Sequence, residues 1–156
     1  MAKTLGKDAT CSIARALEVL GDTWTVLIIR EALIAGSTRF QEFRDALGIA
    51  PNILSRRLET LVEQGIFERR AYREPGERSR YEYVLSDAGR GLNVVIAALA
   101  DWGRTYRPQS DGTSPTFSRA DDGTVAELAF VTEEGGRIAP ARLVARRTED
   151  ARLRAS

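Results

Sequence analysis

Two polar residues, Asn52 and Arg56, are four positions apart and so share one face of a helix, with Ser55 at the edge of that face. Amide, hydroxyl and guanidinium groups hydrogen-bond base edges in a DNA major groove: Arg to guanine, Asn to adenine and Ser to either. An ordinary amphipathic helix with a polar outer side shows the same pattern. The elements around these residues must therefore decide what the pattern means.

Arginines are concentrated next to this segment. Five of them lie between residues 69 and 80 against two acids, although the formal net charge of the chain is only +1. A charge run alone is usually a solvated face, but DNA responds to a local positive surface rather than to the total charge. We expect phosphate contacts from the following side chains: Arg39, Arg57, Arg73, Arg78 and Arg80.

The only cysteine, Cys11, lies just before an expected helix, with Lys7 nearby. Free N–H groups and the helix dipole favour a thiolate at such a position. The alternative is a small apolar residue that fills space beside Trp24. A single cysteine cannot form an internal disulfide, which is typical of a reducing cytoplasm, and we expect the protein to be cytoplasmic.

Catalytic and metal-binding patterns are scarce. The chain has no histidine, and it contains no nucleophile elbow, Walker loop or dinucleotide-binding glycine motif. The segment after residue 107 has neither Cys nor His, so it offers no zinc ligands. No apolar stretch is long enough for a signal peptide or a membrane span. We therefore expect no enzyme, no cofactor, no metal and no membrane contact.

Hydrophobic periodicity predicts four short helices in the first part of the chain. We place them at residues 12–20, from Thr23 to a stop at Gly36, 38–47 and 51–64. A capping box of Thr38 and Gln41 should start the third helix, and Pro51 suits the first turn of the fourth. The short turn Gly48-Ile49-Ala50 between these two helices indicates helix-turn-helix geometry.

A hairpin and a long helix should follow. Residues 66–72 and 80–85 are rich in aromatic and β-branched residues, and Glu74-Pro75-Gly76-Glu77 between them is typical of a turn. An arginine-rich hairpin after a helix-turn-helix is a wing, which can follow phosphates or enter the minor groove. A helix over residues 86–106 should then carry a heptad seam for a dimer that includes Leu92, Val95, Leu99 and Trp102. Packing on its own domain alone is the other interpretation of this seam.

The fold class that we predict is mainly α (α+β): a winged helix-turn-helix domain over 8–106 with a long C-terminal dimerisation helix. Residues 107–123 are rich in Ser, Thr, Gly, Pro and Asp and should be a linker. The C-terminal extension, 124–156, should form an extra β-hairpin: a strand at 124–131, a turn at 133–136 and a returning strand within 137–147.

Five stretches together resemble one known family, the HxlR-type winged-helix regulators, which are related to the MarR group. They are CSIARAL from Cys11, GDTWT from Gly21, RFQEF from Arg39, ILSRRLETL from Ile53 and YEYVLSDAGR from Tyr81. The resemblance runs from Cys11 to Tyr106. It implies a homodimer held by terminal helices, with the fourth helix in the major groove and the hairpin on the DNA backbone. It also aligns Cys11 with a cysteine that senses oxidants, quinones or aldehydes in some members. Ala50 departs from the Ser or Thr that often caps the recognition helix in relatives.

We therefore expect a sequence-specific regulator of transcription that binds double-stranded DNA as a homodimer. It should act as a repressor on a palindromic operator and respond to an electrophile or another small molecule. The alternative function is a winged-helix module that binds another protein without touching DNA, because a fold does not fix a function. An interaction helix would more often expose aromatic or aliphatic anchors where this chain has Asn52, Ser55 and Arg56.

Overall fold

A computed structural model describes residues 11–73, 75, 76, 78–110 and 114–144. The chain divides into two units, one ending at Pro115 and the other beginning at Thr116, and each is described by itself.

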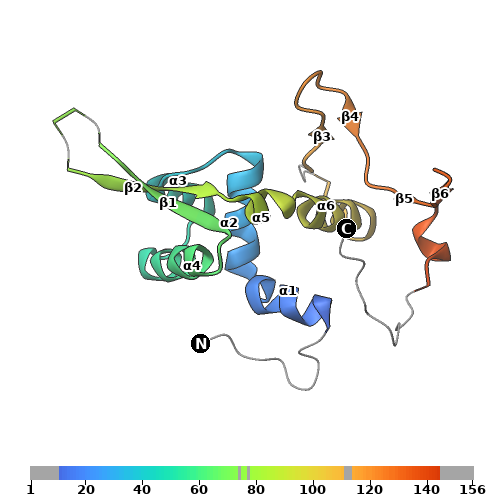
Figure 1. The fold of residues 1–156 in the computed structure, drawn as a ribbon, viewed down its shortest axis with the longest axis horizontal. Coiled ribbons are helices and arrows are strands. Elements are labelled where there is room, and N and C mark those ends of the chain that lie inside the picture. The colour runs from blue at the N-terminus through green and yellow to red at the C-terminus, as the bar shows by residue number, and fades with distance from the viewer. Residues whose placement is uncertain (1–10, 74, 77, 111–113, 145–156) are drawn as a thin grey trace. The chain divides into compact units, whose positions relative to one another are not determined.

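Four helices form the first part of unit 1, as the periodicity predicted (Figure 1). They are α1 (Ser12–Leu20), α2 (Thr23–Ile34), α3 (Phe40–Leu47) and α4 (Pro51–Glu63). Helix α2 packs against the other three and carries the fully buried Ile28 and Ile29. Phe43 of α3 and Leu54 of α4 are also fully buried. The core of unit 1 therefore lies where α2, α3 and α4 meet, and it fixes the polar side of α4 outward.

The capping of α3 differs from the prediction. Helix α3 begins at Phe40, one residue after Arg39. Its cap is the carboxylate of Glu42 and not the side-chain amide of Gln41. Glu42 Oε2 accepts hydrogen bonds from the backbone N–H groups of Thr38 (2.8 Å) and Arg39 (2.9 Å). Gln41 instead donates to Asp45 one turn along. The N-cap is Arg39, one residue later than the predicted Thr38, which moves the N3 position from Gln41 to Glu42.

The expected hairpin is present as β1 (Phe67–Tyr72) and β2 (Arg80–Leu85), an antiparallel pair in which Phe67 lies opposite Leu85 and Tyr72 opposite Arg80. Figure 1 shows it projecting from the helices. Its base is fixed, since Phe67 is buried edge-on against Phe43 of α3, with ring centroids 6.1 Å apart. In the turn, Gly76 has a φ of 83°, a conformation that favours glycine. Glu74 and Glu77, predicted as part of that turn, lie outside the described residues.

The predicted helix over 86–106 is divided in two. Helix α5 (Asp87–Gly91) is capped by Ser86, whose Oγ accepts from the Gly89 N–H at 3.1 Å, and α6 (Asn93–Tyr106) follows. The interruption falls at Leu92, whose N–H donates to the carbonyl of Gly89 three residues back rather than four. Gly89 and Gly91 weaken the helix there, because glycine loses more backbone conformational entropy on folding than any other residue. The 14-residue α6 carries most of the predicted seam.

Unit 2 contains two short hairpins. Strand β3 (Phe117–Ser118) pairs with β4 (Val125–Ala126), and β5 (Phe130–Val131) pairs with β6 (Arg137–Ile138), followed by the 3₁₀ turn η2 (Pro140–Arg142). The hairpin around the 133–136 turn is confirmed, but the strand predicted over 124–131 is split, and β3 lies in the stretch that we predicted to be a linker. The returning strand is only two residues long, and residues 145–147 lie outside the described part of the chain. No residue between 116 and 144 is buried, so these strands have no core of their own.

Candidate nucleic-acid interface

The outer side of α4 carries the residues predicted to contact bases. Leu54 and Leu58 are completely buried, and Leu61 is 1% exposed, which confirms the predicted inner face. Asn52 and Arg56 are exposed on the other side, and Ser55 is half-buried at its edge. Ala50 makes no side-chain cap, and its carbonyl accepts from the amides of Ile53 and Leu54. An amide and a guanidinium therefore stand in solvent over the first turns of α4.

The wing carries exposed arginines whose surroundings differ. Arg70 pairs with Glu68 of its own strand at 2.8 Å, and the Arg69 guanidinium lies 4.5 Å from the centroid of the Tyr81 ring. Both are thus held along the hairpin. The three arginines of the predicted phosphate set, Arg73, Arg78 and Arg80, are exposed around the hairpin's outer end. Burial raises the pKa of Tyr83 on β2, although the charge of Arg69 opposes that shift, so the Tyr83 hydroxyl stays neutral at pH 7.

Arg39 lies where the wing meets the helices. It precedes α3, forms an isolated β-bridge with Glu82 of β2, and places its guanidinium 4.6 Å from the centroid of the Tyr72 ring. Next to it, the Tyr83 N–H donates to the Thr38 carbonyl at 2.7 Å. Arg39 is exposed, so it presents a positive charge between α3 and the wing while its ring contact orients it.

Arg57 does not share the surroundings of the other predicted phosphate contacts. Its Nη2 donates to Asp22 Oδ2 at 2.7 Å, and only 26% of its side chain is exposed. Asp22 is the N-cap of α2 and is 35 positions away in the chain. Nothing in the local sequence predicted this partner, although Asp22 three residues before Thr25 is a recognisable cap signal. The cationic surface is therefore carried by residues other than Arg57.

The predicted dimer seam is largely uncovered in the single chain. Leu99 is 51% exposed and Trp102 is 54% exposed, whereas Leu92 and Val95 are half-buried. Ile96, the next residue on α6, is the one that fills the core. On α1, which has no buried residue, Ile13 and Leu17 of the apolar face are also exposed.

Cys11 occupies the N-cap position of α1, with an extended backbone and an exposed side chain. Its carbonyl accepts the first hydrogen bond of the helix, from the Arg15 N–H at 3.1 Å. In the single chain it is therefore not a core residue, contrary to the space-filling interpretation. Lys7 lies outside the described residues.

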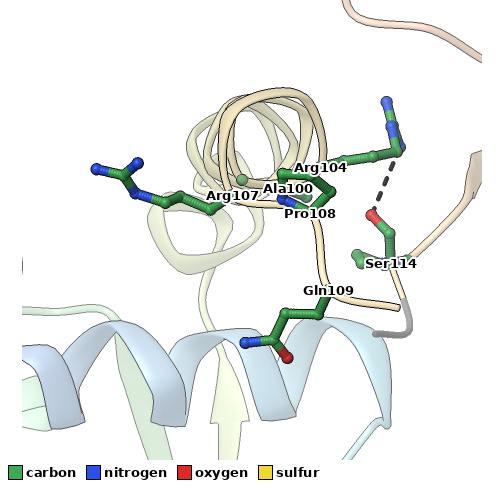
Figure 2. A pocket seen from close by; sticks show the side chains of 8 residues that line it. Ala100, Arg104, Arg107, Pro108, Gln109 and Ser114 are labelled. Carbon is green, nitrogen blue, oxygen red and sulfur yellow. Dashed lines mark hydrogen bonds between the residues drawn. The ribbon is translucent and has the colours of Figure 1, made fainter. Parts of the chain in front are cut away.

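An open depression of about 310 Å³ lies at the end of α6, lined by residues of the helix and by Pro108, Gln109, Ser114 and Pro115. Figure 2 shows the Arg104 and Arg107 side chains leaving the helix in different directions. Arg104 pairs with Asp101, and the Arg107 guanidinium lies 5.8 Å from the centroid of the Trp102 ring. The two cations do not converge on one point, so we assign no ligand to this depression.

Two further searches concern only the described residues. No group of His, Cys, Asp and Glu side chains there could hold a metal ion. Within the same residues, no helix is long and apolar enough to cross a membrane.

The chain is similar to known regulators in sequence. Residues 19–111 match the family described as HxlR-like helix-turn-helix. An uncharacterised HTH-type transcriptional regulator of Mycobacterium bovis is 46% identical over 101 residues, which are 65% of this chain and 62% of that protein. The match thus spans less than two thirds of the length of that relative.

Two solved structures are also similar. The candidate transcription factor PA1607 aligns with a TM-score of 0.73 and 36% identity over 91% of this chain and 98% of its own, so the match extends well beyond Pro115. The redox regulator HypR in its reduced form aligns with a TM-score of 0.54 and 29% identity over 61% of this chain and 92% of its own. With four helices, a wing and a family match over residues 19–111, this chain belongs to the HxlR-like helix-turn-helix family.

Proposed function

We propose that this protein is a transcriptional regulator without catalytic activity, which binds double-stranded DNA sequence-specifically as a homodimer, with α4 in the major groove and the wing on the backbone. The observation that carries the proposal is the exposed amide and guanidinium of Asn52 and Arg56 on a helix whose opposite face is completely buried. A helix fixed on one side and polar on the other can enter a major groove without losing its packing.

The interface has two kinds of contact. Asn52, Ser55 and Arg56 contact base edges and supply sequence preference. Arg39, Arg73, Arg78 and Arg80 contact phosphates and supply affinity that depends on salt but little on sequence. We do not include Arg57 among the phosphate contacts, because its guanidinium is already paired with Asp22.

The dimer is formed through α6 and α1. Leu99, Trp102 and Ile13 are more than half exposed, and a stable monomer rarely leaves so many large apolar side chains in water. The seam includes Leu92, Val95, Leu99 and Trp102. A two-fold dimer reads a palindrome with half-sites about 10 base pairs apart, or a multiple of that spacing.

The protein is a cytoplasmic repressor, which binds its operator and prevents transcription until an effector releases it from the DNA. The exposed Cys11 at the N-terminus of α1 supports an oxidant or electrophile as that effector, and the similar protein HypR is a redox regulator. A modification at Cys11 would alter α1, one of the two helices that we place in the dimer.

The test begins by selecting bound fragments from a random DNA library with purified protein. Affinity for the selected site is then measured by fluorescence anisotropy over a range of salt concentrations. Arg56→Ala should cost about 1–3 kcal/mol on the selected site and relax the preference at one position. Arg78→Ala should weaken binding to all sequences alike and make the log–log salt slope shallower by about 0.9.

Arg104→Ala is the matched control, because it removes the same charge from α6, where Arg104 pairs with Asp101. It should leave both the selected-site affinity and the salt slope unchanged. Wild-type protein that binds no duplex, or Arg56 and Arg78 variants that bind like wild type, would contradict this docking.

A further inference from the structure

One carboxylate connects the N-terminus of α2 with the middle of α4. Asp22 Oδ1 accepts from the Thr25 N–H at 3.2 Å, and Asp22 Oδ2 accepts from Arg57 Nη2 at 2.7 Å. The Asp22 side chain is 34% exposed, so both of its oxygens accept these hydrogen bonds in a partly desolvated environment. The negative charge is also favourable at a helix N-terminus. Asp22 is thus oriented by α2 before it contacts Arg57.

Among the described residues, Asp22 is the one hydrogen-bond partner found for the Arg57 guanidinium. The buried Nε of Arg57 has no partner within that part of the chain, so the pair with Asp22 is the contact there that orients the guanidinium. A buried, unpartnered donor costs free energy, so this arrangement lowers the stability of the fold somewhat.

The side chains that α4 buries in the core are apolar: Leu54, Leu58 and Leu61. Leu54 and Leu58 are completely buried, and such packing is favourable but has little directional preference. A charged hydrogen bond is directional as well as strong. Because Arg57 follows Arg56 by one residue, about 100° around the helix, fixing Arg57 against α2 also fixes the direction in which Arg56 leaves α4.

We propose that Asp22 and Arg57 form a positioning pair that sets the rotation of α4, so that Asn52 and Arg56 meet base edges in register. The inference rests on the proposed function, and it assigns Arg57 to specificity although it touches no DNA. It also gives a role to Asp22, which follows the Gly21 C-cap of α1 and so lies at the joint between α1 and α2.

The experiment is a double-mutant cycle. Asp22→Asn keeps an oxygen that can cap Thr25 but removes the charge, and Arg57→Gln keeps a polar chain without the guanidinium. For wild type, both single variants and the double variant, affinities are measured for the selected site and for unrelated duplex, alongside urea unfolding. The readout is the ratio of the two affinities under conditions where every variant is folded.

Each single variant should lower that ratio about tenfold, equivalent to about 1.4 kcal/mol, and the double variant should be no worse than either single one. Binding of unrelated duplex and the salt slope should stay near wild type. Arg57→Lys, which keeps the charge and reaches the same carboxylate, should recover part of the ratio. Combining Arg56→Gln with Asp22→Asn tests whether Asp22 acts through Arg56. If it does, the combined variant should lower the affinity ratio by less than the sum of the two single losses. Additive losses would mean that the two residues act independently.

Two results would overturn the inference. If Arg57 contacted phosphate, Arg57→Gln would weaken both duplexes alike and flatten the salt slope, while Asp22→Asn would have no effect on the ratio. If the pair only stabilised the fold, unfolding would shift and the ratio would not. Wild-type protein that bound neither duplex would instead contradict the proposed function itself.

Discussion

At the scale of single residues, what holds a guanidinium decides its role. Arg56 and Arg57 are neighbours of the same type, yet Arg56 is exposed and Arg57 pairs with Asp22 at 2.7 Å. The sequence pattern placed Arg56 correctly on the outer side of α4, since helical spacing determines faces. It could not reveal the partner of Arg57, because a contact over 35 positions depends on how α2 and α4 pack.

Cys11 is the residue at which regulation can be tested directly. We expect diamide or a quinone to lower the DNA affinity of wild type and to leave Cys11→Ser unaffected. Diamide takes up two electrons and two protons as two Cys11 thiols join in a disulfide between subunits, so a dimer band should appear on a non-reducing gel. The thiol is exposed at a helix N-terminus, where its reaction is sterically open. Equal loss of affinity in both proteins, or in neither, would remove Cys11 from the mechanism.

Glu42 gives a prediction about pH. Hydrogen bonds from the backbone N–H groups of Arg39 and Thr38 hold the pKa of Glu42 below its ordinary 4.5. A group with a lowered folded-state pKa stabilises the fold fully above its ordinary pKa, and this contribution is lost as the pH falls towards the lowered value. In urea unfolding, Glu42→Ala should therefore cost about 1 kcal/mol at pH 7 and progressively less as the pH falls below 4.5.

Two variants separate the cap from other effects of that change. Glu42→Gln keeps an acceptor without a titrating charge, so at pH 7 it should cost less than Glu42→Ala, and its cost should fall with pH in the same way because only wild type titrates at this position. Gln41→Ala removes only the exposed contact with Asp45 and should be nearly neutral. A Glu42→Ala cost that stayed constant from pH 7 to pH 3 would show that the carboxylate does not cap α3.

At the scale of elements, long periodic segments were predictable and interruptions were not. The ranges of α1, α2 and α4 and the pairing of β1 with β2 follow from apolar spacing and turn residues. The start of α3 was displaced by one residue, because Glu42, next to the expected Gln41, accepts from the N–H groups of Thr38 and Arg39. The interruption at Leu92 was missed, since the heptad spacing continues through it while Gly89 and Gly91 favour a change of direction.

Gly89 makes the α5 segment testable. It is buried, and a Cβ there would clash with the Ile66 carbonyl oxygen and lie 2.8 Å from Leu85 Cδ2. Gly89→Ala should therefore destabilise the protein by about 1–3 kcal/mol in urea unfolding. Gly91→Ala is the matched control in the same helix, because a Cβ added there meets no atom within 4 Å beyond its chain neighbours and its own helix backbone, and it should be neutral or stabilising by up to about 1 kcal/mol. Equal effects of the two substitutions would mean that α5 does not pack closely on the Ile66 backbone.

At the scale of the whole molecule, the uncovered apolar faces of α1 and α6 favour a dimer. Leu99→Asp would place an unpaired charge in the seam and should convert the dimer to monomers or aggregate, as measured by light scattering at micromolar concentration. Asp101→Ala on the same helix is the control and should remain dimeric, since Asp101 pairs with Arg104 within α6. Wild type that scattered as a monomer at this concentration would remove the dimer from the proposal.

The absence of buried side chains between residues 116 and 144 has a consequence for backbone dynamics. A hairpin whose hydrogen bonds are not covered by packed side chains opens at almost no free-energy cost, so its amides exchange with solvent deuterium nearly as fast as those of an unfolded peptide. In contrast, helices α2 and α4 contain the fully buried Ile28 and Leu54. We expect the amides of these two helices to exchange only when the whole unit unfolds. Slow exchange at Val125 or Val131 would accordingly report that another surface covers the extension, and the protein concentration at which it appears would tell whether that surface belongs to the same chain or to a second one.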